Sequence, residues 1–155
     1  MPKKTSKSGA KVKVEGITPF LWYKDDAEEA ARFYVSLFQG SKVTSVSPMV
    51  VEFHLAGQAV MALNGGPHHE HTDAFSFCVS CKTQEDIDAL WERLSEGGET
   101  SRCGWLKDKY GVSWQIIWSG LGKAMGGRRG QQVMEAMLKM DKFDVAELKR
   151  AAKGA

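Results

Sequence analysis

Apolar and polar positions along the chain follow a pattern that occurs twice. In the first copy a strand-like run at residues 17–23 leads into an amphipathic helix at 25–38, and short strand-like runs follow it. In the second copy a run at 75–81 leads into a helix at 83–96, which is again followed by short runs. One strand–helix–strands unit is too small to bury a core, so the repetition predicts two units paired in one domain.

Each predicted helix carries one apolar stripe, as expected for a helix that lies on a sheet. In the first helix the stripe is formed by Ala30, Phe33, Tyr34, Leu37 and Phe38. In the second helix it is formed by Ile87, Leu90, Trp91 and Leu94. Asp25 or Asp26 can cap the first helix, and Thr83 has the capping-box spacing to Asp86. Strands are predicted at 42–47, 50–56 and 59–64 and again at 99–105, 106–109 and 112–118.

These elements divide the chain into three parts. Residues 1–15 form a Lys-rich tail that we expect to be flexible, and residues 16–120 form the paired domain. Within the domain the first module spans 16–64 and the second spans 74–118. Residues 121–155 are expected to form a helical appendage that packs on the domain or on a dimer partner.

The net charge of +2 comes from the tail, which holds five lysines and one glutamate. The rest of the chain is slightly acidic, which argues against a nucleic-acid-binding body. No apolar run reaches the roughly 20 residues that cross a bilayer. The N-terminus lacks the apolar stretch of a secretory signal. We therefore expect a cytoplasmic protein with no nucleic-acid or membrane partner.

Cysteine and histidine clusters are the first candidates for metal binding. Cys78 and Cys81 are three residues apart in a predicted strand, so they point to opposite faces, and we interpret both as packing residues. The three cysteines are expected to be free thiols in a reducing compartment. His68, His69 and His71 lie in a connecting loop, where adventitious metal capture is plausible but a catalytic site is not expected.

Four strings in the chain carry a family resemblance: ITPFLWY at 17–23, AARFY at 30–34, MALNGGP at 61–67 and WLKDKYGVSWQ at 105–115. They resemble the PhnB-like branch, named 3-demethylubiquinone-9 3-methyltransferase domain, of the vicinal-oxygen-chelate superfamily. That superfamily includes glyoxalase I, bleomycin-resistance proteins and extradiol dioxygenases. The resemblance covers about residues 16–152. It implies an α+β fold in which two βαβββ modules form a curled, cup-like mixed sheet, usually in a homodimer.

The resemblance also implies where a metal would bind. Metal enzymes of the superfamily hold a divalent cation through His and Glu side chains on the first, fourth, fifth and eighth strands. Carried over to this chain, the positions are Thr18, Ala62 or Asn64, Phe75 or Ser76, and Gln115. None of these is His, Glu, Asp or Cys, and neutral oxygens alone hold a divalent cation poorly. We therefore predict no metal site and no cofactor.

Side-chain alternation, combined with the superfamily geometry, predicts which residues line the cup. The predicted ligand-binding set is Thr18, Phe20, Trp22, Asn64, Ser76 and Gln115. Glu52 and His54 share a face of the third strand and form the candidate acid–base pair, unless they simply face water. Aromatic walls with a few polar groups suit a small aromatic or amphipathic ligand.

Three hypotheses about function remain open. The leading one is a binding protein that holds such a ligand in its cup without the usual metal. The second is an enzyme: a metal-dependent lyase or dioxygenase, or the ubiquinone-pathway methyltransferase of the family name. Against the methyltransferase, no G-x-G-x-x-G loop follows a predicted strand. The third is a scaffold whose cup is filled by its own side chains.

Overall fold

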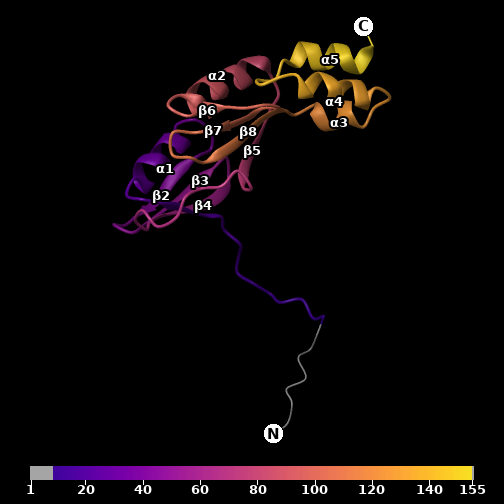
Figure 1. Ribbon diagram of the computed structural model, residues 1–155. Coiled ribbons are helices and arrows are strands. Elements are labelled where there is room, and N and C mark those ends of the chain that lie inside the picture. The colour runs from indigo at the N-terminus through magenta and orange to yellow at the C-terminus, as the bar shows by residue number, and fades with distance from the viewer. Residues whose placement is uncertain (1–8, 155) are drawn as a thin grey trace.

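The structure is a computed structural model that describes residues 9–154 (Figure 1). The first module contains β1 (Phe20–Tyr23), α1 (Ala27–Val35), β2 (Lys42–Val46), β3 (Val50–Leu55) and β4 (Gln58–Asn64). The second contains β5 (Ser76–Cys81), α2 (Gln84–Ser95), β6 (Glu99–Thr100), β7 (Trp105–Lys107) and β8 (Ser113–Trp118). They are followed by α3 (Leu121–Met125), α4 (Gly130–Leu138) and α5 (Val145–Lys153). Residues 9–18 are exposed and form no helix or strand, and the rest of the predicted flexible tail, residues 1–8, lies outside the described residues.

Each module forms its own four-stranded mixed sheet, and the strand order is equivalent in the two sheets. The first sheet has the order β1-β4-β3-β2 and the second has the order β5-β8-β7-β6. β1 is parallel to β4 and β5 is parallel to β8, whereas the other neighbours are antiparallel. The predicted α+β fold of two βαβββ modules is confirmed, with the eight strands divided equally between two sheets.

Alternation along the strands places one face of each sheet against the helices. Leu21 and Tyr23 in β1, and Trp114 and Ile116 in β8, are buried in the core on this side. Phe20 lies on the opposite side of β1 and is 48% exposed. We call this opposite side of the two sheets the open face.

The two cysteines of β5 follow the same rule. Cys81 is buried, but Cys78 is exposed, because it lies on the open face beside Gln115 of β8. The prediction that both are packing residues is therefore wrong for Cys78.

The helices begin at polar caps, one of which comes from a distant strand. The Thr83 side chain accepts a hydrogen bond from the Asp86 backbone N–H, which confirms the predicted cap of α2. Asp26 occupies the predicted N-cap position of α1, but its side chain makes no capping hydrogen bond. The Asn64 Oδ1, at the end of β4, instead accepts a hydrogen bond of 2.9 Å from the Ala27 backbone N–H.

A buried polar network joins the two modules on the helix side. Tyr23 donates a hydrogen bond to the Tyr34 Oη at 3.0 Å, and Tyr34 donates to the Asp108 Oδ2 at 2.6 Å. The Trp114 Nε1 also donates to Oδ2, and the Oδ1 of Asp108 accepts two backbone N–H groups of the following turn. Burial raises the pKa of both tyrosines, so their hydroxyls stay protonated and can donate.

The C-terminal helices lie at one end of the second sheet, away from the first module (Figure 1). Phe143 and Leu148 are buried in the common core. Gln84 at the start of α2 connects the helices to the domain: its Nε2 donates to the Phe143 carbonyl at 2.8 Å, and its Oε1 accepts from the Val145 N–H at 2.7 Å.

Within residues 9–154, none of the helices is both long and apolar enough to cross a membrane.

Candidate ligand site between the modules

A cleft of about 250 Å³ opens where β1, the linker between the modules and the start of β8 meet. Its wall is mostly apolar. Phe20 and Phe75 at this cleft are 48% and 47% exposed, so a ligand could cover both rings. We call it the junction cleft, and its lining includes Phe20, Trp22, His71, Thr72, Phe75 and Ser113.

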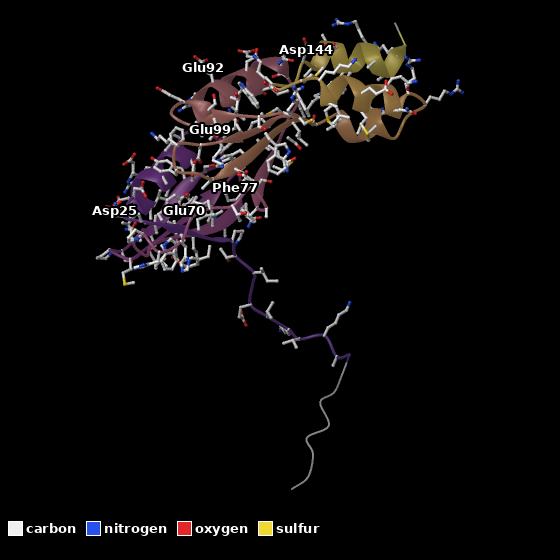
Figure 2. The ribbon with its side chains drawn as sticks, in the orientation of Figure 1. Asp25, Glu70, Phe77, Glu92, Glu99 and Asp144 are labelled. Carbon is white, nitrogen blue, oxygen red and sulfur yellow. The ribbon has the colours of Figure 1, made fainter. Side chains whose placement is uncertain are left out.

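Trp22 holds the linker in place beside β1. Its Nε1 donates a hydrogen bond of 2.9 Å to the Gly66 carbonyl. Gly65 lies so close to the indole that a Cβ there would come within 2.3 Å of a ring carbon, so the close approach requires glycine. The linker then continues past the first module, and Figure 2 shows Glu70 at the same end of the molecule as Asp25. The hydrogen bond from Trp22 to Gly66 thus fixes the chain just before the histidines of the linker.

His71 is the linker side chain with the most unusual environment. Its Nε2 is buried and has no hydrogen-bond partner among the described residues. Its ring meets Tyr23 edge to face, with 5.3 Å between the ring centroids. Burial lowers the pKa of His71, and the carboxylate of Asp108 and the backbone of Trp22 oppose this with smaller effects, so the ring is neutral at pH 7. A buried nitrogen without a partner costs about 1–3 kcal/mol, which a ligand hydrogen bond would recover.

A second cleft, of about 470 Å³, borders the same linker. It shares Trp22, Glu70 and His71 with the junction cleft and adds Lys109 and Tyr110 from the turn before β8. His71 and Trp22 therefore stand between two hollows, and the side with Lys109 is the more polar one.

A polar group borders the junction cleft on the side of the second sheet. The Ser113 Oγ donates a hydrogen bond of 2.9 Å to the Asp73 Oδ1, and the Lys107 Nζ lies 3.2 Å from the same oxygen. The hydrogen bond from Ser113 and the charge of Lys107 lower the pKa of the Asp73 carboxyl, so it is ionised at pH 7. Apolar walls and this polar border together resemble an ordinary small-molecule site.

The structure distributes the predicted site residues over separate places. Phe20 and Trp22 line the junction cleft. Thr18, Glu52 and His54 lie together in a shallow hollow of about 170 Å³ elsewhere on the open face of the first sheet. Among the described hydrogen bonds, none joins Glu52 to His54, so the sequence pair lacks the contact that would orient the imidazole.

Ser76, Gln115 and Asn64 have other partners. The Gln115 Nε2 donates a hydrogen bond of 3.0 Å to the Ser76 Oγ, so these two lie together on the open face of the second sheet. Asn64 lies on the helix side, because it pairs in parallel register with Tyr23. Its Oδ1 caps α1 and its Nδ2 donates to the Pro48 carbonyl, so its side chain does not face the open side.

The positions carried over from metal enzymes do not fit a divalent cation. Asn64 faces away from the open side, and the Ser76 hydroxyl and the Gln115 amide bind each other. These groups are neutral oxygen donors without a carboxylate or an imidazole. Over residues 9–154, His, Cys, Asp and Glu side chains form no group of three that could hold a metal ion.

Among the residues that line the junction cleft, sequence reasoning missed His71, Phe75 and Ser113. His71 was visible only as part of a histidine-rich loop, Phe75 only as an alternative metal position, and Ser113 as one residue of the motif at 105–115. The run Gly65-Gly66-Pro67 before the histidines was the available signal, because glycine permits the close approach to Trp22 that anchors the linker.

The sequence and the fold of this chain are similar to those of known proteins. A family model described as 3-demethylubiquinone-9 3-methyltransferase matches residues 15–117. The PhnB protein from Bacillus cereus is 35% identical, with a TM-score of 0.63 over 66% of this chain and 98% of the relative. No match is found among curated proteins.

More distant structures share the fold alone. A protein from Pseudomonas aeruginosa is 19% identical, with a TM-score of 0.57 over 66% of this chain and 96% of its own. The fosfomycin resistance protein FosX from Mesorhizobium loti is 16% identical, with a TM-score of 0.54 over 74% of this chain and 100% of its own. The family match ends at residue 117, before α3, α4 and α5.

Proposed function

The chain belongs to the 3-demethylubiquinone-9 3-methyltransferase family, and on that premise we propose that it binds a small aromatic or amphipathic molecule in the junction cleft. The observation that carries the proposal is the combination of half-exposed aromatic rings with a buried imidazole nitrogen that lacks a partner. Rings supply apolar area, and the nitrogen supplies a polar contact that would orient the ligand.

The ligand that fits this cleft is a flat ring with one hydrogen-bonding substituent. Phe20, Trp22 and Phe75 offer ring surfaces for it. Because Nε2 has almost no exposed surface, a ligand hydroxyl or N–H group would reach it only if the His71 ring turned toward the cleft, and it would then give this nitrogen its missing partner. No metal is needed for this binding, since apolar contact and one hydrogen bond carry it.

Titration with 2-naphthol, a flat ring with one hydroxyl donor, tests the proposal. We expect a saturable shift of the Trp22 indole N–H signal in ¹H–¹⁵N spectra. Phe20→Ala and Phe75→Ala each remove a half-exposed ring and should weaken binding about fivefold, since a partly buried aromatic ring contributes roughly 1 kcal/mol.

Met49→Ala is the matched control, because Met49 is an apolar residue, 62% exposed, that is not part of the junction cleft. It should leave the affinity for 2-naphthol unchanged. If the Trp22 signal does not respond, or if the two Phe variants bind as tightly as the wild type, the junction cleft is not the ligand site.

A second candidate is the methyl transfer that the family description names. The unpartnered Nε2 of His71 favours it, because this nitrogen, once the ring turns toward the cleft, could accept the proton of a ring hydroxyl while the oxygen takes the methyl group from a sulfonium donor. Mass spectrometry after incubation with S-adenosylmethionine and a catechol would detect the methylated ring, and His71→Gln should abolish it. If the wild-type protein forms no such product under these conditions, the proposal of methyl transfer to a catechol fails.

We also propose that the protein is a cytoplasmic homodimer, as its family resemblance implies. Met134 and Leu138 of α4 leave apolar surface exposed, away from the junction cleft, that a second copy could cover. The three free cysteines suit a reducing compartment. Native mass spectrometry counts the subunits, and a protein that stays monomeric at tens of micromolar would contradict the dimer.

A further inference from the structure

The C-terminal appendage contains a cleft of its own, beyond the part of the chain that the family model matches. The cleft has a volume of about 430 Å³ and opens between the end of β8, α3 and α5, and we call it the appendage cleft. These elements lie at the end of the molecule away from the first module (Figure 1). Its lining includes Trp118, Gly120, Lys123, Lys149, Ala152 and Lys153.

An aromatic ring with small neighbours forms the apolar part of this cleft. Gly120 approaches Trp118 so closely that a Cβ would come within 2.3 Å of the indole. Ala124 and Ala152 are also small and line the same cleft. A cleft of this size with an aromatic wall is suited to a flat ring that stacks on the indole.

The appendage cleft is separate from the junction cleft. Trp118 alternates along β8 with Ile117, so it lies on the same side as the buried Ile116 and opposite to the open face. The two clefts have no lining residue in common.

Three lysines supply the polar part of the cleft. Lys123, Lys149 and Lys153 line it without any acidic residue, and in the part of the chain that the structure describes none of them forms an ion pair. Lys149 and Lys153 are four residues apart on α5, where like charges repel. The Lys149 Nζ lies over the Trp118 ring, 5.7 Å from its centre, so an aromatic anion that stacks on this face would displace the ammonium from the ring and pair with its charge.

We propose that the appendage cleft binds an aromatic anion, whose ring stacks on Trp118 and whose carboxylate or phosphate is held by the three lysines. The anion would relieve the repulsion between Lys149 and Lys153 and complement the unpaired positive charge. This site would give the protein a second ligand class, independent of the one proposed for the junction cleft.

Titration with 2-naphthoate, followed by the indole N–H signal of Trp118 and assigned with Trp118→Phe, tests the proposal. We expect a saturable shift that weakens as salt is raised, because salt screens exposed charges. The uncharged 2-naphthamide should bind at least about fivefold more weakly. Lys149→Gln should weaken naphthoate binding roughly two- to fivefold, as expected for one exposed ion pair. Replacement of all three lysines by Gln should abolish it.

Lys139→Gln is the control, because Lys139 is an exposed lysine at the end of α4 that does not line the cleft. It should leave naphthoate binding unchanged. Thermal melts confirm that each variant folds. Equal affinity for naphthoate and naphthamide, or an unchanged response in the triple variant, would overturn the proposal. Binding of RNA or of phosphatidylglycerol vesicles through the same lysines, without any naphthoate response at Trp118, would also overturn it.

Discussion

Tyr34 and Asp108 belong to different modules, 74 residues apart, and meet in the core through a hydrogen bond of 2.6 Å from the Tyr34 Oη to the Asp108 Oδ2. Asp108 is only 2% exposed. Its carboxylate also accepts the Trp114 indole N–H and two backbone N–H groups, so the buried charge is fully hydrogen-bonded. This contact therefore ties the first helix to the turn before β8 and fixes the position of the two modules.

Tyr34→Phe should destabilise the fold by about 1.5–3 kcal/mol, the usual contribution of a hydrogen bond to a charged group. Urea unfolding measures the loss. Tyr110→Phe is the matched control, because the Tyr110 hydroxyl donates at 2.8 Å to Glu29 at the surface. The loss of this exposed hydrogen bond should lower the free energy of unfolding by only about 0–1 kcal/mol. Equal losses in the two variants would contradict a special role for the bond between Tyr34 and Asp108.

Asn64→Ala should lower the free energy of unfolding by about 1 kcal/mol, because it removes the side-chain cap of α1 and the bond to the Pro48 carbonyl. Circular dichroism during urea unfolding provides the measurement. Asp26→Ala serves as the comparison, since Asp26 makes no capping hydrogen bond. If Asp26→Ala costs as much as Asn64→Ala, the assignment of the cap to Asn64 is wrong.

Acidification should destabilise the wild-type protein in part through His71. Burial lowers the pKa of His71 in the folded state below its ordinary value of 6.5. The unfolded chain therefore binds the proton more readily. This contribution to stability is present above about pH 6.5 and is lost as the pH falls through the folded-state pKa.

Urea unfolding at pH 7.5 and 5.5 should thus show a smaller difference in stability between the two conditions for His71→Gln than for the wild type. Thr72→Ala, a neighbouring change without a titrating group, should keep the wild-type difference. The same pH dependence in His71→Gln and in the wild type would exclude this role of His71.

Two glycines at the start of α3, Gly120 and Gly122, should respond to the same substitution in opposite directions. Gly120→Ala should destabilise the protein by roughly 1–3 kcal/mol and move the Trp118 indole, because the new Cβ overlaps the ring. Gly122→Ala should stabilise it by up to about 1 kcal/mol, since Gly122 lies inside α3 and a Cβ there meets nothing within 4 Å. Thermal melts compare the two, and a loss of stability in Gly122→Ala would contradict the open space found beside Gly122.

The sequence was informative where a short pattern determines the outcome. Thr83 caps α2 at the predicted position, since a capping box depends only on residues three apart. Alternation correctly separates Trp22 from Leu21 and Tyr23 on β1. The paired modules also follow from the repeated order of elements.

The candidate site was harder to predict, because its residues come from different elements. Asn64 was expected at the cup, but the parallel register with Tyr23 turns it toward α1. A register shift of one residue reverses the face of a side chain, and the sequence pattern of β4 leaves this choice open. His71 lies in a loop without periodicity, so the sequence does not predict the position of its ring. The hydrogen bond from Trp22 to Gly66, which holds the start of this loop, is visible only in the structure.

Periodicity and capping are local properties, which is why the sequence alone determines the helices, the strands and the apolar faces that pack together. Only the tertiary structure decided three contacts between distant residues: Tyr34 with Asp108, His71 with Tyr23, and Lys149 with Trp118. Each of these pairs joins segments far apart in the chain, and its formation depends on how whole modules and helices pack. The two proposed ligand sites therefore became visible only once the fold had brought those segments together.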